Sequence, residues 1–438
     1  MLQRFQKHIE EHFNFLSESK LLIAVSGGID SVVLAHLCTW MGHDFAICHC
    51  NFKLRGEESD EDEEFVRELA KNFGVPFFST SFNTETFAEE NKLSIQVAAR
   101  DLRYQWFYEL LDNHSYDYVL TAHNTNDNLE TFLINLSRGT GLEGLTGIPP
   151  INKKSVRPLL NFTRDDITLY AIKNGIIWRE DRSNSSIKYI RNKVRHKILP
   201  ILKEINPHIL ETFKYSLDHL NESQEIVDEW VKEASKKIIR QEGELIKLSL
   251  RNLAKLENKK AYLYQVLNSY GFTEWNDVLN LLSAQPGKQV YSKTHRLLKD
   301  RNFLILTIIN KDVLQPKRVL IQASATQITE PIRLDLFKSE IDSTVDQYSI
   351  LLDKDLLKYP LSVRKWAYGD YIYPIGMTGT KKLSQLFKDK KLSLIDKENI
   401  WLLVDAEDNI IWVIGLRQDR RFSVSDKTQN HLKISYTP

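Results

Sequence analysis

A glycine-containing turn near the N-terminus has the residue types and the position of a phosphate-binding loop. The apolar run Leu21–Val25 leads directly into Ser26–Ser31 (SGGIDS), and a helical pattern follows. Glycine lets backbone amides come close to phosphate oxygens, and the start of a helix attracts negative charge. An ordinary strand-to-helix turn capped by Asp30 or Ser31 is the alternative. The loop is not a Walker A loop, because it lacks the lysine and the spacing of GxxxxGK[ST].

Two carboxylates further along the chain have the spacing of an amine-binding pair. Asp127 and Glu130 lie in Thr121–Thr131 (TAHNTNDNLET), directly after the apolar run Tyr118–Ala122. A separation of three residues places both on one face of a helix. Carboxylates form strong, directional hydrogen bonds with an ammonium group. The alternative is a capping role, since acidic residues in the first turn of a helix are favourable by themselves.

Arginines with aromatic neighbours recur in two later segments. Arg100 and Arg103, in ARDLRY, are spaced to share a helix face on which guanidinium groups can hold phosphate or RNA. The segment Tyr189–Arg195 (YIRNKVR) combines arginine, lysine and asparagine with a tyrosine, a composition that suits phosphate contacts and base stacking. A solvated helix stripe is the alternative for both segments.

Together these segments resemble the tRNA(Ile)-lysidine synthetase family of the PP-loop ATP pyrophosphatase superfamily. The family patterns SGGxDS, ARxxRY and AHHxxDQxET match the segments above, and RGxGxxGLxG, RPLL and RNxxR match residues 138–147, 157–160 and 191–195. Phe52 and Asn124 stand where a histidine is common in the family, and Asn126 stands where the family often has the first of two adjacent carboxylates. The resemblance is strong over about residues 20 to 200 and weaker towards the C-terminus.

The resemblance implies a role for each matching residue. The implied ATP-binding residues are Ser26, Gly27, Gly28, Ile29, Asp30, Ser31, His49, Arg55 and Gly139. The implied catalytic residues are Asp30, Arg100 and His123, and Asp30 is also the expected magnesium ligand. The implied lysine-binding residues are Asp127 and Glu130. The implied tRNA-binding residues are Arg103, Arg191, Asn192, Arg195, Lys381, Lys382 and Arg417.

The resemblance also implies a reaction. The substrates would be ATP with magnesium, free L-lysine and an isoleucine tRNA with a CAU anticodon, and the product would be lysidine at the wobble cytidine. Two alternatives stay open: another adenylating tRNA-modifying enzyme such as a tRNA thiolase, and a non-catalytic RNA-binding protein. Thiolation usually needs a cysteine pair or an iron–sulfur cluster, and the chain has only Cys38, Cys48 and Cys50.

Short apolar runs that alternate with longer helical patterns must position these residues. The expected strands are Leu21–Val25, Phe45–His49, Pro76–Thr80 and Tyr118–Ala122, and the expected helices are Ser31–Trp40, Ser59–Phe73 and Leu93–Leu111. This alternation predicts an α/β fold with a doubly wound parallel sheet of PP-loop type. Ligands of such sheets bind at the carboxyl ends of the strands, where the loop and the carboxylate pair are expected.

Beyond the sheet the pattern changes, and 438 residues exceed what one core usually supports. From about Tyr189 to Ser283 the sequence is charged and mostly helical, and from Ile350 short apolar runs alternate with turns. We therefore expect a PP-loop adenylation domain at 1–205 and a helical tRNA-contacting domain at 206–310. A linker and a small β-rich C-terminal tRNA-binding domain are expected at 311–438.

The overall composition restricts the location and the partners. Lys and Arg total 59 against 58 Asp and Glu, so local basic patches must provide any RNA affinity. The chain start lacks a signal-peptide pattern, and no segment approaches membrane-spanning length. The three cysteines lack the spacing of a zinc site and are expected to be reduced. We expect a cytoplasmic protein without a membrane partner, and a homodimer is left open.

Overall fold

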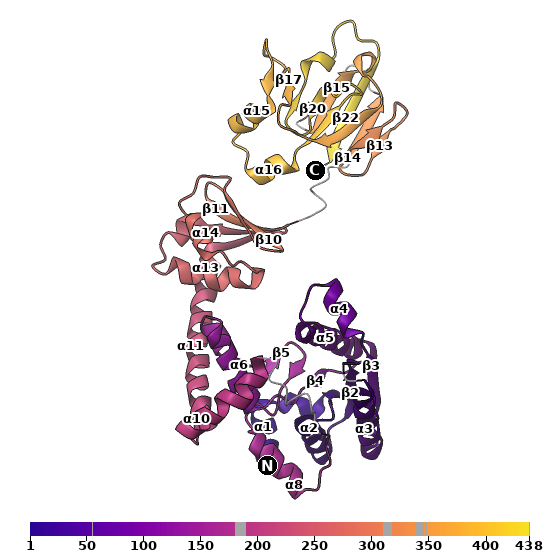
Figure 1. The fold of residues 1–438 in the computed structure, drawn as a ribbon. Coiled ribbons are helices and arrows are strands. Elements are labelled where there is room, and N and C mark those ends of the chain that lie inside the picture. The colour runs from indigo at the N-terminus through magenta and orange to yellow at the C-terminus, as the bar shows by residue number, and fades with distance from the viewer. Residues whose placement is uncertain (55, 180–189, 310–317, 339–345, 347, 438) are drawn as a thin grey trace. The chain divides into compact units, whose positions relative to one another are not determined.

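The computed structural model describes residues 1–54, 56–179, 190–309, 318–338, 346 and 348–437. It divides into two compact units, Met1–Glu229 and Trp230–Pro438. Figure 1 shows the elements of both units. Arg55 and the segment 180–189, which includes Tyr189, lie outside the described residues.

The first unit is built around a mostly parallel sheet (Figure 1). Its described strands are β1 (Leu21–Ala24), β2 (Phe45–Asn51), β3 (Phe77–Ser81), β4 (Tyr118–Leu120), β5 (Ile151–Asn152) and β6 (Ser155–Val156). Its described helices include α1 (Leu2–His12), α2 (Ile29–Trp40), α3 (Glu57–Phe73), α4 (Thr84–Glu90), α5 (Ile95–His114), α6 (Thr125–Ser137), α7 (Leu142–Leu145), α8 (Arg164–Lys173), α9 (Ile190–Lys193), α10 (Leu199–Ile205) and α11 (Ile209–Ile238), the last continuing into the second unit. The described strands are ordered β3-β2-β1-β4-β6-β5, and only β5 runs antiparallel to its neighbour.

Alternation along β1 explains why helices cover both faces of this sheet. Leu21 and Ile23 pack in the core that holds α2 and α8, whereas Leu22 packs in the core that holds α5. All of these strand residues are fully buried, as expected for a central strand covered on both sides. The predicted doubly wound sheet is therefore confirmed.

The carboxyl ends of β1 and β4 lead directly into helix starts. Ser26–Gly28 connects β1 to α2, and residues 121–124 connect β4 to α6. Because β1 and β4 are parallel neighbours, paired from Leu21 with Tyr118 to Ile23 with Leu120, both connections leave the sheet at the same edge. The sheet therefore brings the loop and the carboxylate pair to one edge.

The second unit is richer in strands than in helices. Its described elements are β7 (Ile239–Glu242), β8 (Leu245–Ser249), α12 (Leu250–Leu253), α13 (Lys259–Leu267), α14 (Trp275–Asn280), β9 (Gln289–Tyr291), β10 (His295–Lys299), β11 (Phe303–Ile308), β12 (Val319–Ile321), β13 (Gln327–Ile328), β14 (Arg333–Lys338), β15 (Ser349–Asp353), β16 (Leu361–Lys365), β17 (Tyr371–Ile372), β18 (Lys381–Lys382), α15 (Leu383–Asp389), α16 (Leu394–Asn399), β19 (Trp401–Val404), β20 (Ile410–Val413), β21 (Arg417–Gln418) and β22 (His431–Thr437). The described sheets are ordered β7-β8-β11-β10-β9, β12-β16-β19-β20-β21, β13-β14-β22-β15 and β17-β18. The expected β-rich C-terminal region is confirmed.

The helical pattern of the middle region did not predict the sheet to which β7 and β8 belong. Strands β7 and β8 pair antiparallel within the stretch that the sequence describes as mostly helical. They are joined through Gly243, whose φ of 58° suits a tight turn. Charged residues such as Arg240 and Lys247 alternate with apolar ones on these strands, so the apolar runs that mark the other strands are absent here.

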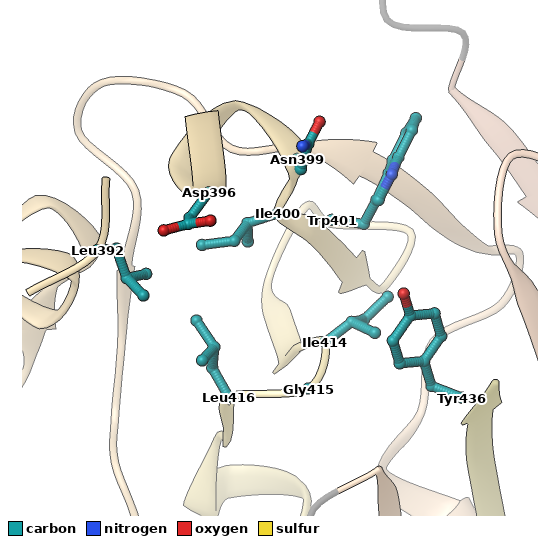
Figure 2. Close-up of a pocket in the computed structure, with 9 residues that line it drawn as sticks. All are labelled: Leu392, Asp396, Asn399, Ile400, Trp401, Ile414, Gly415, Leu416 and Tyr436. Carbon is teal, nitrogen blue, oxygen red and sulfur yellow. The ribbon is translucent and has the colours of Figure 1, made fainter. Parts of the chain in front are cut away.

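A cavity of about 300 Å³ lies in the C-terminal part of the second unit (Figure 2). Leu392, Ile400, Trp401, Ile414 and other mostly apolar side chains line it. Its charged lining residue, Asp396, already accepts hydrogen bonds from Ser393 in the capping box of α16. The cavity therefore offers no reactive group for the predicted chemistry. No helix among the described residues is long and apolar enough to cross a membrane.

Candidate active site

The Ser26–Gly28 loop is held in shape by its own serines. The Ser31 hydroxyl accepts a hydrogen bond from the Ser26 amide at 3.1 Å and donates one to the Gly28 carbonyl at 2.8 Å. Gly27 has a φ of +90°, which favours glycine. Gly28 is the N-cap of α2, and no described side chain caps that helix start. The amides at the start of α2 are therefore suited to an anionic ligand.

His49 supports this loop from the neighbouring strand. Its ring is 4% exposed, and Nδ1 donates to the Val25 carbonyl oxygen at 2.8 Å. This bond fixes the end of the chain segment that enters the loop. A direct contact between His49 and ATP stays a prediction.

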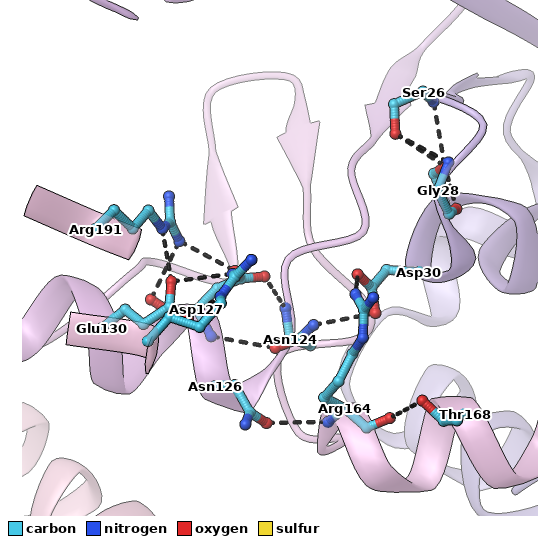
Figure 3. Close-up of polar contacts among 12 residues, drawn as sticks. Ser26, Gly28, Asp30, Asn124, Asn126, Asp127, Glu130, Arg164, Thr168 and Arg191 are labelled. Atoms are coloured by element: carbon cyan, nitrogen blue, oxygen red, sulfur yellow. Dashed lines mark hydrogen bonds and ion pairs between the residues drawn. The ribbon is translucent and has the colours of Figure 1, made fainter. Parts of the chain in front are cut away.

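Asp30 lies where the starts of α2, α6 and α8 meet (Figure 3). Its carboxylate accepts a hydrogen bond from the Asn124 side-chain amide at 3.1 Å and forms an ion pair with Arg164. Burial raises the pKa of Asp30 to about 6, although Arg164 acts in the opposite direction. The site therefore holds a carboxylate whose charge is poorly solvated and attracts cations.

Asp127 and Glu130 lie on one face of α6, as their spacing predicts. Both carboxylates bind two arginines from the segment that follows 180–189 (Figure 3 shows Arg191). The Arg191 Nε lies 2.7 Å from the Glu130 Oε2, and the Arg195 Nε lies 2.6 Å from the Glu130 Oε1. Both guanidinium groups also reach the Asp127 Oδ1, at 3.1 and 3.2 Å. The predicted lysine-binding pair and two predicted tRNA-binding residues thus form one charge-balanced cluster.

Asp127 also has the capping role that its position allows. Its Oδ2 accepts a hydrogen bond from the Asn124 amide at 3.1 Å, and the Asn124 side chain accepts one from the Asp127 amide at 3.1 Å. This capping box starts α6. Glu130 has no share in it and is fully buried, so capping does not explain a carboxylate at this position.

His123 and the arginines of α5 border this cluster. Burial lowers the pKa of the His123 imidazole, which is therefore neutral near pH 7, and its Nδ1 lies 3.1 Å from the Thr121 hydroxyl. Arg103 packs over the Phe52 ring at 5.2 Å, and Arg100 is exposed and lies over the Tyr104 ring. The predicted catalytic roles of Arg100 and His123 stay predictions.

The glycine-rich segment after α6 packs closely against that helix. The Asn128 side chain accepts a hydrogen bond from the Ile148 amide at 2.7 Å, and a Cβ on Gly147 would lie 2.3 Å from the same oxygen. A Cβ on Gly144 would lie 1.9 Å from the Thr140 hydroxyl. Close packing therefore explains why Gly144 and Gly147 are glycines, because a side chain at either position would collide with a neighbouring residue. Gly139 has a φ of +74° with no atom near its missing Cβ, and its contact with ATP stays a prediction.

The other predicted RNA contacts lie at separate places. Asn192 is half-buried in α9. Lys381 pairs with Asp389 at 2.6 Å, Lys382 is exposed at the end of β18, and the Arg417 guanidinium donates to the Ile375 carbonyl at 2.6 Å. Lys381, Lys382 and Arg417 belong to the second unit.

Two residues of the site were missed or misjudged from the sequence. Asn124 departs from the family pattern, yet it contacts both Asp30 and Asp127. Arg164 was not singled out at all, although it pairs with Asp30. One signal was available: an arginine directly after the capping residue Thr163 opposes the positive end of the helix dipole, and a nearby carboxylate makes this arrangement more favourable.

Comparisons with known proteins cover most of the chain. A PP-loop domain model matches residues 1–202, a TilS substrate binding domain model matches 241–310, and a TilS substrate C-terminal domain model matches 361–435. Among solved structures, the U34-tRNA thiolase NcsA from Methanococcus maripaludis superimposes with a TM-score of 0.41 and 17% identity, over 50% of this chain and 80% of that chain.

Curated relatives match along the entire length. The tRNA(Ile)-lysidine synthase of Parabacteroides distasonis is 39% identical over 444 residues, covering 100% of both chains. The tRNA(Ile)-lysidine synthase of Bacteroides thetaiotaomicron is 38% identical, covering 98% of this chain and 97% of that chain. With these full-length matches and the geometry of its site, the chain belongs to the tRNA(Ile)-lysidine synthase family.

Proposed function

We propose that this enzyme ligates L-lysine to carbon 2 of the wobble cytidine in the CAU anticodon of an isoleucine tRNA, giving lysidine. The reaction converts ATP to AMP and pyrophosphate and passes through an adenylated tRNA. The enzyme would act in the cytoplasm. Membership in the tRNA(Ile)-lysidine synthase family supports the reaction type, and the PP-loop domain supports the use of ATP.

One structural observation carries the proposal: Asn124 joins the phosphate loop to the carboxylate pair. Its side-chain amide binds Asp30, while its backbone amide binds Asp127 (Figure 3). A nucleotide on the Ser26–Gly28 loop and an amine on Asp127 and Glu130 would therefore bind within one continuous polar network. Adenylation and amine transfer on the same cytidine need this proximity.

The two chemical steps assign different tasks to the two parts of the site. In the first step the cytosine oxygen on carbon 2 attacks the α-phosphate, and pyrophosphate leaves. The loop amides would hold the phosphates, because aligned donors stabilise developing negative charge. In the second step the ε-amine of lysine attacks carbon 2, loses a proton and expels AMP. Asp127 and Glu130 would orient lysine through its ammonium groups.

Asp30 fits the magnesium ion that accompanies ATP. Magnesium is usually held by one or two carboxylates together with substrate phosphates, and the described residues contain no cluster of three or more metal-binding side chains. Asp30 supplies such a carboxylate beside the loop, and its raised pKa reflects a charge that a cation would stabilise. Magnesium would neutralise phosphate charge there.

Each of the three expected domains would have its own task. Residues 1–205 would perform the chemistry, 206–310 would contact tRNA, and 311–438 would link and bind tRNA. Arg103, Arg191, Asn192 and Arg195 would contact the anticodon region, and Lys381, Lys382 and Arg417 would contact phosphates elsewhere on the tRNA.

Labelled lysine incorporation tests the function directly. Purified enzyme should transfer labelled lysine to a CAU-anticodon isoleucine tRNA only when ATP is present, and pyrophosphate should appear in equal amount. A tRNA with a different wobble base serves as the control. ATP-dependent sulfur transfer without lysine incorporation would support the thiolase alternative, and tRNA binding without pyrophosphate release would support a non-catalytic protein.

The buried surroundings of the three cysteines argue against the thiolase alternative. Burial raises the pKa of the Cys38 and Cys50 thiols to about 12, and it raises that of Cys48 as well. Sulfur chemistry needs a thiolate, which these surroundings disfavour.

The raised pKa of Asp30 predicts an acidic limit to ATP use. The carboxylate that can bind a cation is lost as the pH falls through about 6, so kcat/KM for ATP should fall in the same range. Saturating magnesium keeps the phosphates of ATP ionised, so the enzyme rather than the substrate sets the profile. A profile of kcat/KM that stays flat down to pH 5 would contradict a role for ionised Asp30.

Lys382 should contribute to tRNA affinity but not to chemistry. The Lys382→Gln change should weaken tRNA binding modestly and reduce the slope of log K against log salt by about one, because one phosphate contact is lost. Single-turnover rates at saturating tRNA should not change. Lys358→Gln is the matched control, since Lys358 pairs with Glu407 on the surface of the same unit. Equal salt slopes in wild type and Lys382→Gln would remove Lys382 from the interface.

A further inference from the structure

Arg164, the first residue of α8, extends its guanidinium group to Asp30 beside the phosphate loop (Figure 3). We propose that Arg164 binds the β- and γ-phosphates of ATP and stabilises the pyrophosphate leaving group. The ion pair with Asp30 is then the arrangement without nucleotide. This inference rests on the proposed function and adds to it a phosphate-binding residue outside the loop.

The backbone of Arg164 is fixed beside the loop. Its amide donates to the Asn126 side-chain oxygen at 3.0 Å, and its carbonyl accepts from the Thr168 hydroxyl at 2.9 Å. The chain before it is tied to the start of α6, because the Thr125 hydroxyl donates to the Leu160 and Phe162 carbonyls at 2.8 and 3.0 Å. The base of the side chain is thus anchored, while the side chain itself is 44% exposed and free to change partner.

The helix starts around Arg164 differ in how their amides are satisfied. Helices α6 and α8 begin with capping boxes at Asn124 and Thr163. Helix α2 begins at Gly28, and no described side chain caps it. The amides of α2 are therefore the ones suited to phosphate, and Arg164 lies at the Asp30 end of the same helix start.

Carboxylates offset the unfavourable position of Arg164 at a helix start. A cation in the first turn of α8 opposes the positive end of its dipole, and Asp165 and Asp166 in the same turn act in the opposite direction. Asp30 compensates for one charge, but Asp30 also accepts a hydrogen bond from Asn124 and is the proposed ligand of magnesium. When ATP arrives with its magnesium, the carboxylate gains a new cation and the triphosphate supplies new anions. If Arg164 moves from Asp30 to the phosphates, Asp30 would pair with magnesium and the phosphates would pair with Arg164. Each of these charges would then have a partner of opposite sign.

The chemistry of the reaction favours the leaving group over the nucleoside as the partner of Arg164. The bond that breaks joins the α-phosphorus to the bridging oxygen of the β-phosphate, and negative charge accumulates on pyrophosphate. A planar guanidinium donates two parallel hydrogen bonds to phosphate oxygens, which a lysine ammonium does not. Arg164 would therefore act most strongly on pyrophosphate release.

Product inhibition by inorganic pyrophosphate and by AMP distinguishes binding of the leaving group by Arg164 from a structural role of this residue. In Arg164→Met, KM for ATP and the inhibition constant of inorganic pyrophosphate should both rise about ten- to a hundredfold, through loss of a charge-assisted contact. The inhibition constant of AMP and KM for lysine should not change. Arg164→Lys should recover part of the loss. Arg4→Gln is the matched control, because Arg4 pairs with Asp166 on the same helix without touching Asp30.

Each result of the inhibition experiment either supports or overturns the proposed role of Arg164. An equal rise in the inhibition constants of AMP and pyrophosphate would assign Arg164 a structural role and overturn the proposal, as would wild-type inhibition by pyrophosphate in Arg164→Met. Thermal unfolding of each variant shows whether α8 stays folded. The wild-type enzyme in the same assay tests the proposed function separately: if it releases no pyrophosphate with ATP and tRNA, the function fails, whatever Arg164 does.

Discussion

A Gly28→Val enzyme should release no measurable pyrophosphate and transfer no lysine while it remains folded. Gly28 has φ −72° and ψ 155°, a conformation that valine adopts without strain. A Cβ there would make an ordinary contact of 3.5 Å with the Ser26 hydroxyl. The valine methyl groups would, however, cover the amides at the uncapped start of α2. Loss of one aligned donor typically costs about a hundred- to a thousandfold in rate, and the valine would cover more than one.

Neighbouring substitutions sharpen the test. Gly28→Ala should retain part of the activity, because a single methyl group covers less of the loop. Gly27→Ala is the less informative change, since a φ of +90° strains any side chain there and mixes folding with function. Pyrophosphate release and the thermal unfolding midpoint should be measured on each variant. A Gly28→Val enzyme with the wild-type unfolding midpoint and wild-type turnover would show that phosphate does not bind at this loop.

Glu130→Gln should impair lysine transfer by roughly ten- to a hundredfold and still allow adenylated tRNA to form. The estimate takes about 1.5 to 3 kcal/mol for a charge-assisted hydrogen bond and about 1.4 kcal/mol for each decade. Glutamine keeps the shape of the side chain but lacks the charge that attracts an ammonium group. A quench assay that follows the adenylate and the lysine product separately measures both steps.

The arginines on this carboxylate require a stability control. Glu130 is fully buried and binds Arg191 and Arg195, so its substitution removes one of the two carboxylates that pair with these guanidinium groups and leaves Asp127 as the other. Removal of one member of a buried ion pair is destabilising. The thermal unfolding midpoint of Glu130→Gln should therefore fall, and kinetics should be measured well below it. An equal loss in both chemical steps would move Glu130 from lysine to ATP or to the arginine cluster alone.

Asp127→Asn makes the sharper comparison because capping is preserved. An asparagine oxygen can still accept the hydrogen bond from the Asn124 amide that starts α6. The ion pairs of Asp127 with Arg191 and Arg195 lose one charge, so the thermal unfolding midpoint should fall somewhat, whereas KM for lysine should rise. Wild-type lysine kinetics in Asp127→Asn would remove Asp127 from the lysine site and leave it the helix cap and the ion pairs with Arg191 and Arg195.

The local elements of the fold were predictable because their signals are local. Apolar runs followed by glycine or asparagine turns predicted β1, β2, β3 and β4 within a few residues. The three-residue spacing of Asp127 and Glu130 placed them on one face of α6 without any tertiary information. Strands β7 and β8 escaped prediction because charged residues interrupt their apolar pattern.

The partners of these residues were decided by the tertiary structure. Asp30 and Arg164 are 134 positions apart in the chain, and Glu130 and Arg191 are 61 apart, so no periodicity links them. Asp30 and Arg164 meet because parallel neighbours β1 and β4 deliver two helix starts to one sheet edge, and hydrogen bonds from Thr125 bring the start of α8 to the same place. The sequence by itself determined which groups could do chemistry. Only the packing of the helix starts decided which charges neutralise one another, because a buried carboxylate takes the cation that the fold places beside it.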